Sequence, residues 1–270
     1  MEDFISIMAA PLAASLILVG IHAYLGLHVL AREVIFVDLS LAQIAALGST
    51  LAFLAGYDLH SFPAYIFSLC ATFFGAAIFA LTPMRYSRIP QEAIIGIVYA
   101  VSAAAGILAI DKAPHGAEHI KQMLVGAILW VTWTDVGKIF LIYLLIGLIH
   151  YVFRKRFLAL SFDKSTPETW NNRAWDFFFY ATFGLVITNS VEIAGVLLVF
   201  TFLIVPAVCA TLFTGQLGKR LAIGCGVGFM VSALGCTLSY TFDLPTGAAI
   251  VCLFGCALLI LALCKRLFTA

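Results

Sequence analysis

The sequence predicts an all-α fold, a polytopic membrane helix bundle with about nine transmembrane helices, within a range of eight to ten. Of its 270 residues, 63% are hydrophobic and 11% are charged, which leaves too little polar surface to cover a water-soluble globule. The charged residues are also clustered, and stretches of 18 to 28 residues between the clusters carry no Asp, Glu, Lys or Arg. Because about 20 apolar residues cross a bilayer as a helix, these stretches predict membrane spans.

Nine apolar segments follow one another along the chain. They lie near residues 6–30, 36–55, 62–82, 92–110, 138–153, 174–188, 193–213, 221–240 and 246–264. A further apolar piece, residues 122–134, holds only 13 residues, which predicts a re-entrant or interfacial helix instead of a span. The longest polar connection, residues 154–173, is too short to fold alone, so residues 1–270 are expected to form a single transmembrane domain.

The distribution of basic residues predicts the orientation in the membrane. With nine spans, twelve of the 15 Lys and Arg residues fall on one side, and only Lys112, Lys121 and Lys138 fall on the other. Cytoplasmic loops carry the excess of Lys and Arg, so the N-terminus is expected outside and the C-terminus in the cytoplasm. The formal net charge is +1 and no basic stripe occurs, which argues against nucleic acid as a partner.

No nucleotide-binding motif of the GxxxxGK[ST] type occurs in the chain. If the protein moves a solute uphill, the energy must therefore come from an ion gradient or from a partner subunit. Paired interrupted helices, which are expected of a gradient-driven carrier, are not visible in the sequence.

Ionisable residues in the apolar segments are candidates for a path or a metal site, because burying them in a membrane is costly. Such residues are His22 and His28 in the first segment, Glu33 and Asp38 at the entry to the second, Glu92 at the start of the fourth and Glu192 at the start of the seventh. Imidazole and carboxylate together suit first-row divalent metals such as zinc or manganese. His22 and His28 are about 120° apart on an ideal helix, so sharing one metal would need a third element. For each residue, a polar helix end or a bond to a backbone carbonyl is an equally weighted alternative.

The densest polar cluster lies in the predicted outer loop. His115, Glu118 and His119 are spaced i, i+3 and i+4, which would place them on one face of a helix. The order HxxEH occurs in inverted zinc peptidases, but those enzymes need a folded domain and a third ligand, for which this loop is too short. Two interpretations stay open, an outer vestibule that captures metal weakly and a solvated loop.

Four stretches resemble the permease subunits of the bacterial zinc, manganese and iron uptake ABC transporters, the ABC-3 type metal permease family. The most specific stretch runs from Glu192 to Phe213 and contains Pro206-Ala207, like the family's apolar helix that ends at its cytoplasmic coupling segment. Residues 91–98, 124–135 and 239–248 are similar to the start of the family's middle helix, to another family block and to the turn before its last helix.

The resemblance implies the membrane-spanning permease of an ATP-driven importer of divalent metal ions (zinc, manganese or iron), with a homodimer forming the path. It implies two protein partners, a cytoplasmic ATP-binding subunit and an extracytoplasmic metal-binding protein, and a multi-pass location in the lipid of the bacterial inner (plasma) membrane. The chain would then be a transport subunit and not an enzyme, with no permanently bound cofactor. The expected ATPase coupling residues are Pro206, Ala207, Gly215 and Gly218, with the helix disrupted at the proline.

The second segment departs from the family pattern, in which His usually follows Asp by four residues on one helical face. After Asp38, the corresponding positions hold Ala42 or Gln43, and Asp38 and Gln43 are about 140° apart on an ideal helix. A histidine of the adjacent first helix could compensate for the missing imidazole. The expected metal path consists of Asp38, His22, His28, Gln43 and Glu192.

Two alternatives stay open at this point. A permease for a chelated metal, such as a siderophore or a corrinoid, shares related architecture and would have a wide path without a tight ligand set. An intramembrane metalloenzyme would hold stoichiometric zinc and turn over without ATP.

Overall fold

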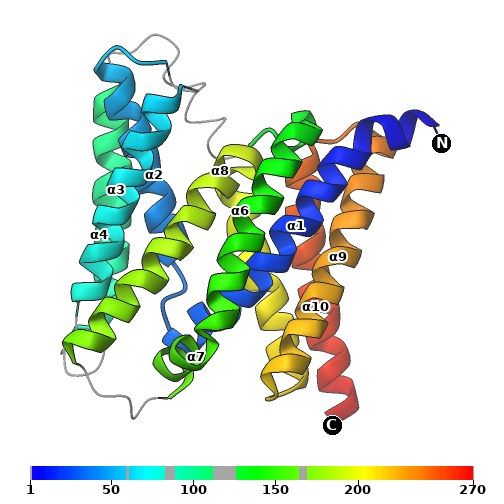
Figure 1. Cartoon of the computed structure of the whole chain (residues 1–270). Helices are drawn as coiled ribbons and strands as arrows, with labels where there is room; N and C mark the ends of the chain where they lie inside the picture. Colours follow the sequence, from blue (N-terminus) through cyan, green and yellow to red (C-terminus); the bar gives the residue numbers. More distant parts are fainter. Residues whose placement is uncertain (1, 59–60, 83–88, 112–125, 164–168, 270) are drawn as a thin grey trace. The chain divides into compact units, whose positions relative to one another are not determined.

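The computed structural model describes residues 2–58, 61–82, 89–111, 126–163 and 169–269. Within these ranges every regular element is a helix, and no strand occurs (Figure 1). Eight of these described helices are long and apolar enough to cross a membrane. The predicted all-α membrane bundle is therefore confirmed.

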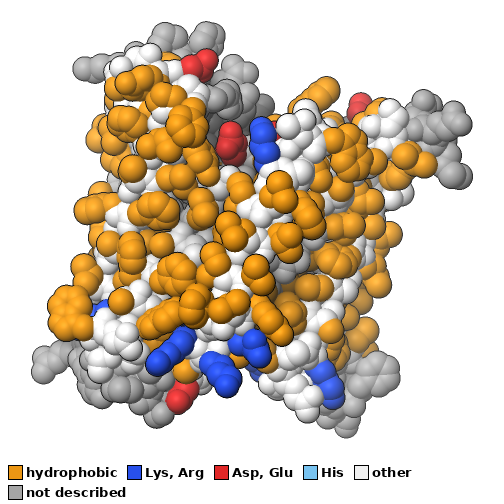
Figure 2. Space-filling model, in the orientation of Figure 1, with side chains coloured by type: hydrophobic (Ala, Val, Ile, Leu, Met, Phe, Trp, Pro, Cys, Tyr) orange, Lys and Arg blue, Asp and Glu red, His pale blue; other side chains and the backbone are white. Residues whose placement is uncertain are grey.

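The helices follow the predicted apolar segments in order. They are α1 (Glu2–Arg32), α2 (Val37–Leu54), α3 (Phe62–Leu81), α4 (Gln91–Ile110), the 3-10 turn η1 (Ile128–Trp130), α6 (Trp133–Val152), α7 (Arg154–Phe162), α8 (Trp170–Phe213), α9 (Leu217–Phe242) and α10 (Thr246–Thr269). Hydrophobic side chains cover most of the face shown in Figure 2, far more than the surface of a soluble monomer exposes. This surface suits contact with lipid tails.

α8 consists of two helical segments joined at Gly195. As one straight helix its 44 residues would extend about 66 Å, roughly twice the thickness of the hydrocarbon core. The helix is interrupted at Gly195, where φ is 76° and ψ is 160°, a conformation essentially restricted to glycine. Each segment is long enough to span, so the described helices hold nine segments of spanning length, as the sequence predicts.

The start of α6 differs from the predicted boundary at residue 138. Thr132 and Asp135 cap this end reciprocally: the Thr132 N–H donates to Asp135 Oδ2 at 3.2 Å, and the Asp135 N–H donates to Thr132 Oγ1 at 3.3 Å. α6 therefore begins at Trp133. Of the predicted re-entrant piece, the residues before this cap that the structure describes form only the short turn η1, which does not span.

α7 is a helix that hydropathy did not predict, because its first three residues are Arg154, Lys155 and Arg156. These three side chains are exposed, whereas Phe157 is fully buried. The Phe157 ring stacks on the ring of His150, with 4.3 Å between the centroids. The packing of one aromatic side chain thus fixes a segment whose composition resembles that of a loop.

The chain divides into two compact units, which are described separately. Unit 1 comprises Met1–Leu30, Leu124–Gly147 and Glu192–Ala270, and unit 2 comprises Ala31–Met123 and Leu148–Val191. In sequence, α1, α6 and α8 each begin in one unit and end in the other.

Close helix contacts hold each unit together. In unit 1, α9 packs at Gly228 against Val19 of α1 and at Gly235 against Ile250 of α10, so closely that a Cβ at either glycine would overlap its neighbour. In unit 2, α3 contacts the first segment of α8 through a 3.1 Å hydrogen bond between the hydroxyls of Thr72 and Thr188. α2 packs against both α3 and α4.

Candidate functional site

His22 lies in α1, within unit 1, and its side chain is fully buried. Its Nδ1 is 2.7 Å from the carbonyl oxygen of Leu18, so Nδ1 must carry the hydrogen and donate. Nε2 then presents its lone pair and has no hydrogen-bond partner among the described residues. A carbonyl that holds one imidazole nitrogen in this way is the usual support of a metal-binding histidine.

His28 is also fully buried in α1, and its ring packs edge-on against Tyr24, with 4.8 Å between the centroids. No group of three or more His, Cys, Asp or Glu side chains that could hold a metal occurs within the described ranges. His115, Glu118 and His119 lie outside the described residues, so the predicted outer vestibule stays a prediction.

Asp38 and Glu92 lie together at the start of α2, within unit 2. Asp38 is the second residue of α2 and is 1% exposed. Glu92, in the first turn of α4, accepts a 3.0 Å hydrogen bond at Oε1 from the N–H of Phe36, the residue that precedes α2. The Phe36 N–H lies two residues before Asp38, so both acidic residues lie at the start of α2. The positive end of the α2 dipole stabilises negative charge at this position.

Farther along α2, Ala42 is buried and Gln43 is half-buried. Neither α2 nor α4 contains His or Cys, so side chains of these two helices can bind a cation only through oxygen. His22 and His28 belong to unit 1 and Asp38 belongs to unit 2. The predicted partnership of Asp38 with a histidine therefore stays a prediction.

The break in α8 has its own support within unit 1. The N–H of Ala127 donates a 3.1 Å hydrogen bond to the carbonyl of Ile193. Gly126, with φ of 69°, packs so closely on Ala194 and Gly195 that it has no room for a side chain. Glu192 lies just before this break and is exposed. The prediction that Glu192 starts the seventh span is therefore wrong, because Glu192 lies at the end of the first segment of α8. The sequence also does not reveal the contact of residues 126 and 127 with this break.

The predicted coupling residues divide into a buried pair and an exposed pair. Pro206 and Ala207 are buried inside α8, which continues to Phe213, so the expectation that the proline disrupts the helix is wrong. The carbonyl of Pro206 packs against Gly224 of α9. Gly215 and Gly218, beyond the end of α8, are exposed.

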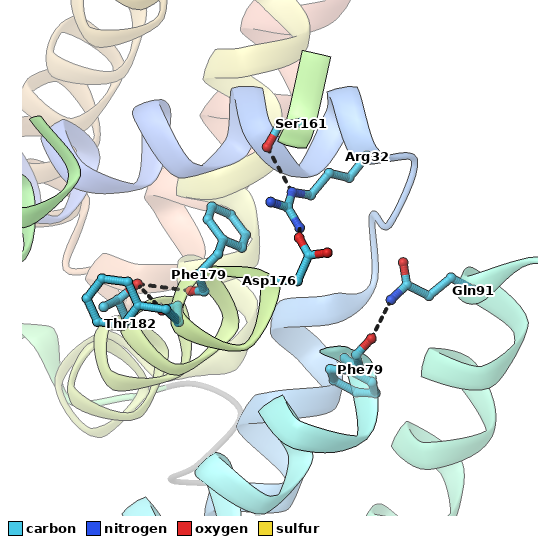
Figure 3. Close-up of polar contacts among 8 residues, drawn as sticks. Arg32, Phe79, Gln91, Ser161, Asp176, Phe179 and Thr182 are labelled. Atoms are coloured by element: carbon cyan, nitrogen blue, oxygen red, sulfur yellow. Dashed lines mark hydrogen bonds and ion pairs between the residues drawn. The ribbon is translucent and has the colours of Figure 1, made fainter. Parts of the chain in front are cut away.

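A buried ion pair in unit 2 was not predicted from the sequence (Figure 3). Arg32, at the end of α1, donates 2.8 Å hydrogen bonds to Asp176 of α8 and to Ser161 of α7. Its guanidinium group lies 4.0 Å from the centre of the Phe179 ring. Arg32 therefore acts inside the fold and is not a solvated loop residue.

Comparison with known protein families gives a match over nearly the whole chain. The ABC 3 transport family matches residues 4–265. The chain belongs to the ABC 3 transport family. It is therefore a multi-span membrane protein of a transport family, and the alternative of an intramembrane metalloenzyme loses its support.

Individual proteins are also similar to this chain. The manganese transport system membrane protein MntC of Listeria innocua is 31% identical over 188 residues, covering 66% of this chain and 67% of MntC. The chelated iron transport system membrane protein YfeC of Yersinia pestis is 28% identical over 180 residues, covering 66% of this chain and 61% of YfeC. The structure of PsaBC from Streptococcus pneumoniae in complex with Fab shares the fold, with a TM-score of 0.75 and 24% identity over 96% of this chain and 94% of that chain.

Proposed function

We propose that the chain is the membrane-spanning permease subunit of an ATP-driven importer of divalent metal ions, and that two copies form the path in a bacterial inner membrane. The family match over residues 4–265, together with one relative named for manganese transport and one named for chelated iron transport, supports this proposal. Iron and zinc belong to the same proposal, but manganese comes first because MntC is named for manganese transport, whereas YfeC is named for chelated iron.

The proposed metal path includes Asp38, His22, His28, Gln43 and Glu192. Two features of the buried residues support it: His22 directs an unbonded Nε2 away from its backbone partner, and the Asp38 carboxyl is enclosed in the bundle. Such groups at membrane depth are costly and usually mark an ion pathway. They suit a bare ion better than a chelate, which needs a wide path without a ligand set.

The proposed partners are a cytoplasmic ATP-binding subunit and an extracytoplasmic metal-binding protein. For the ATP-binding subunit we propose a docking site at the turn between α8 and α9, where Gly215 and Gly218 are exposed. The Arg220 Nε donates a 2.7 Å hydrogen bond to the carbonyl of Thr214, which orders this turn. For the outer side, His115, Glu118 and His119 are proposed to capture metal delivered by the binding protein.

Uptake by the reconstituted complex tests this function. Proteoliposomes that contain the permease, its ATP-binding subunit and the binding protein should accumulate Mn²⁺ only when ATP is supplied. Asp38→Ala should abolish uptake, whereas Asp243→Asn should not, because Asp243 is exposed in a turn and Asn also tolerates its positive φ of 52°. A wild-type complex that transports none of Mn²⁺, Fe²⁺ and Zn²⁺ would overturn the proposal.

A further inference from the structure

Glu92 bonds to the turn before α2 with only one of its two carboxylate oxygens. Its Oε1 accepts the hydrogen bond from the Phe36 N–H, but its Oε2 is enclosed and has no hydrogen-bond partner among the described residues. A carboxylate can accept up to about four hydrogen bonds, so a buried oxygen with none calls for an explanation.

Asp38 presents a second oxygen of this kind. Asp38 lies two residues beyond Phe36, and only 1% of its surface is exposed. Its Oδ1 also has no hydrogen-bond partner in the described part of the chain. Glu92 bonds to the N–H of Phe36, two residues before Asp38, so both acidic residues lie at the same end of α2. Two acidic groups from α2 and α4 therefore lie at the start of α2, and each has a buried oxygen without a hydrogen-bond partner among the described residues.

No basic side chain of the described residues neutralises this pair. The ion pairs found there are Arg32 with Asp176 and Lys138 with Asp135. Arg32 is only six positions before Asp38, but Asp176, Ser161 and the Phe179 ring hold its guanidinium group. A buried carboxyl group beside a half-buried one, with no cation to pair with them, is expensive in an apolar bundle unless a proton or a metal ion joins them.

We propose that Asp38 and Glu92 together form an all-oxygen ion site at the start of α2, and that Glu92 makes this site prefer Mn²⁺ to Zn²⁺. The inference rests on the proposed function, since the ion is the transported metal. Carboxylate oxygens suit Mn²⁺, whereas imidazole and thiolate favour Zn²⁺, and α2 and α4 supply neither His nor Cys. The helix dipole stabilises the empty site, which keeps binding weak enough for release.

The variant Glu92→Gln separates the metal role from the structural role. Gln keeps the size of the side chain and an oxygen that accepts from the Phe36 N–H, but it removes the charge. Full-length permease in lipid nanodiscs is titrated with Mn²⁺, and bound Mn²⁺ is measured by electron paramagnetic resonance. Glu92→Gln should weaken Mn²⁺ binding about tenfold or more, and Zn²⁺ binding less. Glu92→His should reverse the preference, and Asp243→Asn should bind both ions as wild type does.

The same variants in the reconstituted complex distinguish the two proposals. ATP-driven Mn²⁺ uptake by wild type, with an altered ratio of Mn²⁺ to Zn²⁺ uptake in Glu92→Gln, supports the ion site. The ion site would be overturned if Glu92→Gln bound Mn²⁺ as tightly as wild type and kept the same uptake ratio, while only Glu92→Ala showed a defect. That result would show that Glu92 only caps the turn. In that case the proposed function would stand. If the wild-type complex moves no metal, the proposed function itself fails.

Discussion

The N–H of Ala127 donates a hydrogen bond to the carbonyl of Ile193, two residues before the break in α8. An interrupted helix leaves backbone groups without their usual partners, and such groups need a substitute within a membrane. The segment around Gly126 supplies that substitute from a distant part of unit 1. The break is therefore a supported feature of the fold, and substitutions at the contact should affect the whole unit.

The first prediction concerns this contact. In Gly126→Ala the new Cβ would overlap the backbone of Ala194 and Gly195, and alanine would have to adopt a φ of 69°. We expect a loss of about 2 kcal/mol or more in stability, measured as a lower melting temperature of the purified permease. Gly137→Ala is the matched control, because Gly137 has open space around it and lies within helix α6. That control should be neutral or slightly stabilising, and equal melting of both variants would contradict the role of the contact.

The second prediction concerns the buried ion pair of unit 2. Arg32→Met should cost about 3–5 kcal/mol, because it leaves Asp176 with an uncompensated charge at a site where the two side chains are only 1% and 16% exposed. Lys138→Met removes the exposed ion pair with Asp135 and should cost less than about 1 kcal/mol. Thermal or denaturant unfolding in one detergent measures both. If Arg32→Met is no worse than Lys138→Met, the Arg32 network does not stabilise the fold.

The third prediction concerns the orientation. In a version with all seven cysteines replaced, Asp58→Cys should react in whole cells with a thiol reagent that cannot cross the membrane, and Gly215→Cys should react only after lysis. Both positions are exposed, so a difference in labelling reports the side of the membrane. The reverse pattern would place the N-terminus in the cytoplasm.

Hydropathy and charge spacing predicted most of the fold because apolar runs of spanning length are a strong local signal. The same signal fails where individual side-chain contacts, and not the length of an apolar run, decide the structure. α7 begins with three basic residues and is fixed by the burial of Phe157, and α6 begins early because Thr132 and Asp135 cap it. The Thr132-x-x-Asp135 spacing was visible in the sequence and could have given the boundary of α6.

The site was less predictable than the fold. Composition identifies Asp38 and His22 as unusual in apolar segments, and both are buried. The position of Glu92 beside Asp38 depends on the packing of α4 against α2, more than 50 residues apart in sequence, which no local pattern encodes. Pro206 shows the opposite error, because the local rule that proline breaks a helix predicted a disruption, whereas α8 continues through Pro206 to Phe213.

The last prediction concerns coupling to the ATP-binding subunit. Gly215 and Gly218 are exposed, and a Cβ at either position would meet no atom of the chain within 4 Å. A bulky residue there costs the permease little by itself, so any loss of uptake must come from a partner that occupies this surface. Gly215→Trp and Gly218→Trp should therefore leave the melting temperature within about 2 °C of wild type but reduce ATP-driven Mn²⁺ uptake severalfold.

Ala207→Glu provides the contrast for these two variants. Ala207 is 1% exposed and packs close to Gly26 of α1, so a carboxylate at this position would be buried without a partner. Such a change should destabilise the permease by several kcal/mol and lower its amount in the membrane. Melting temperature, membrane abundance and ATP hydrolysis per transported ion are measured for all three variants. If the two tryptophan variants transport normally, the turn between α8 and α9 does not dock the ATP-binding subunit. If a variant loses uptake and also has a lowered melting temperature, its defect lies in folding. We expect this result for Ala207→Glu and not for the two tryptophan variants.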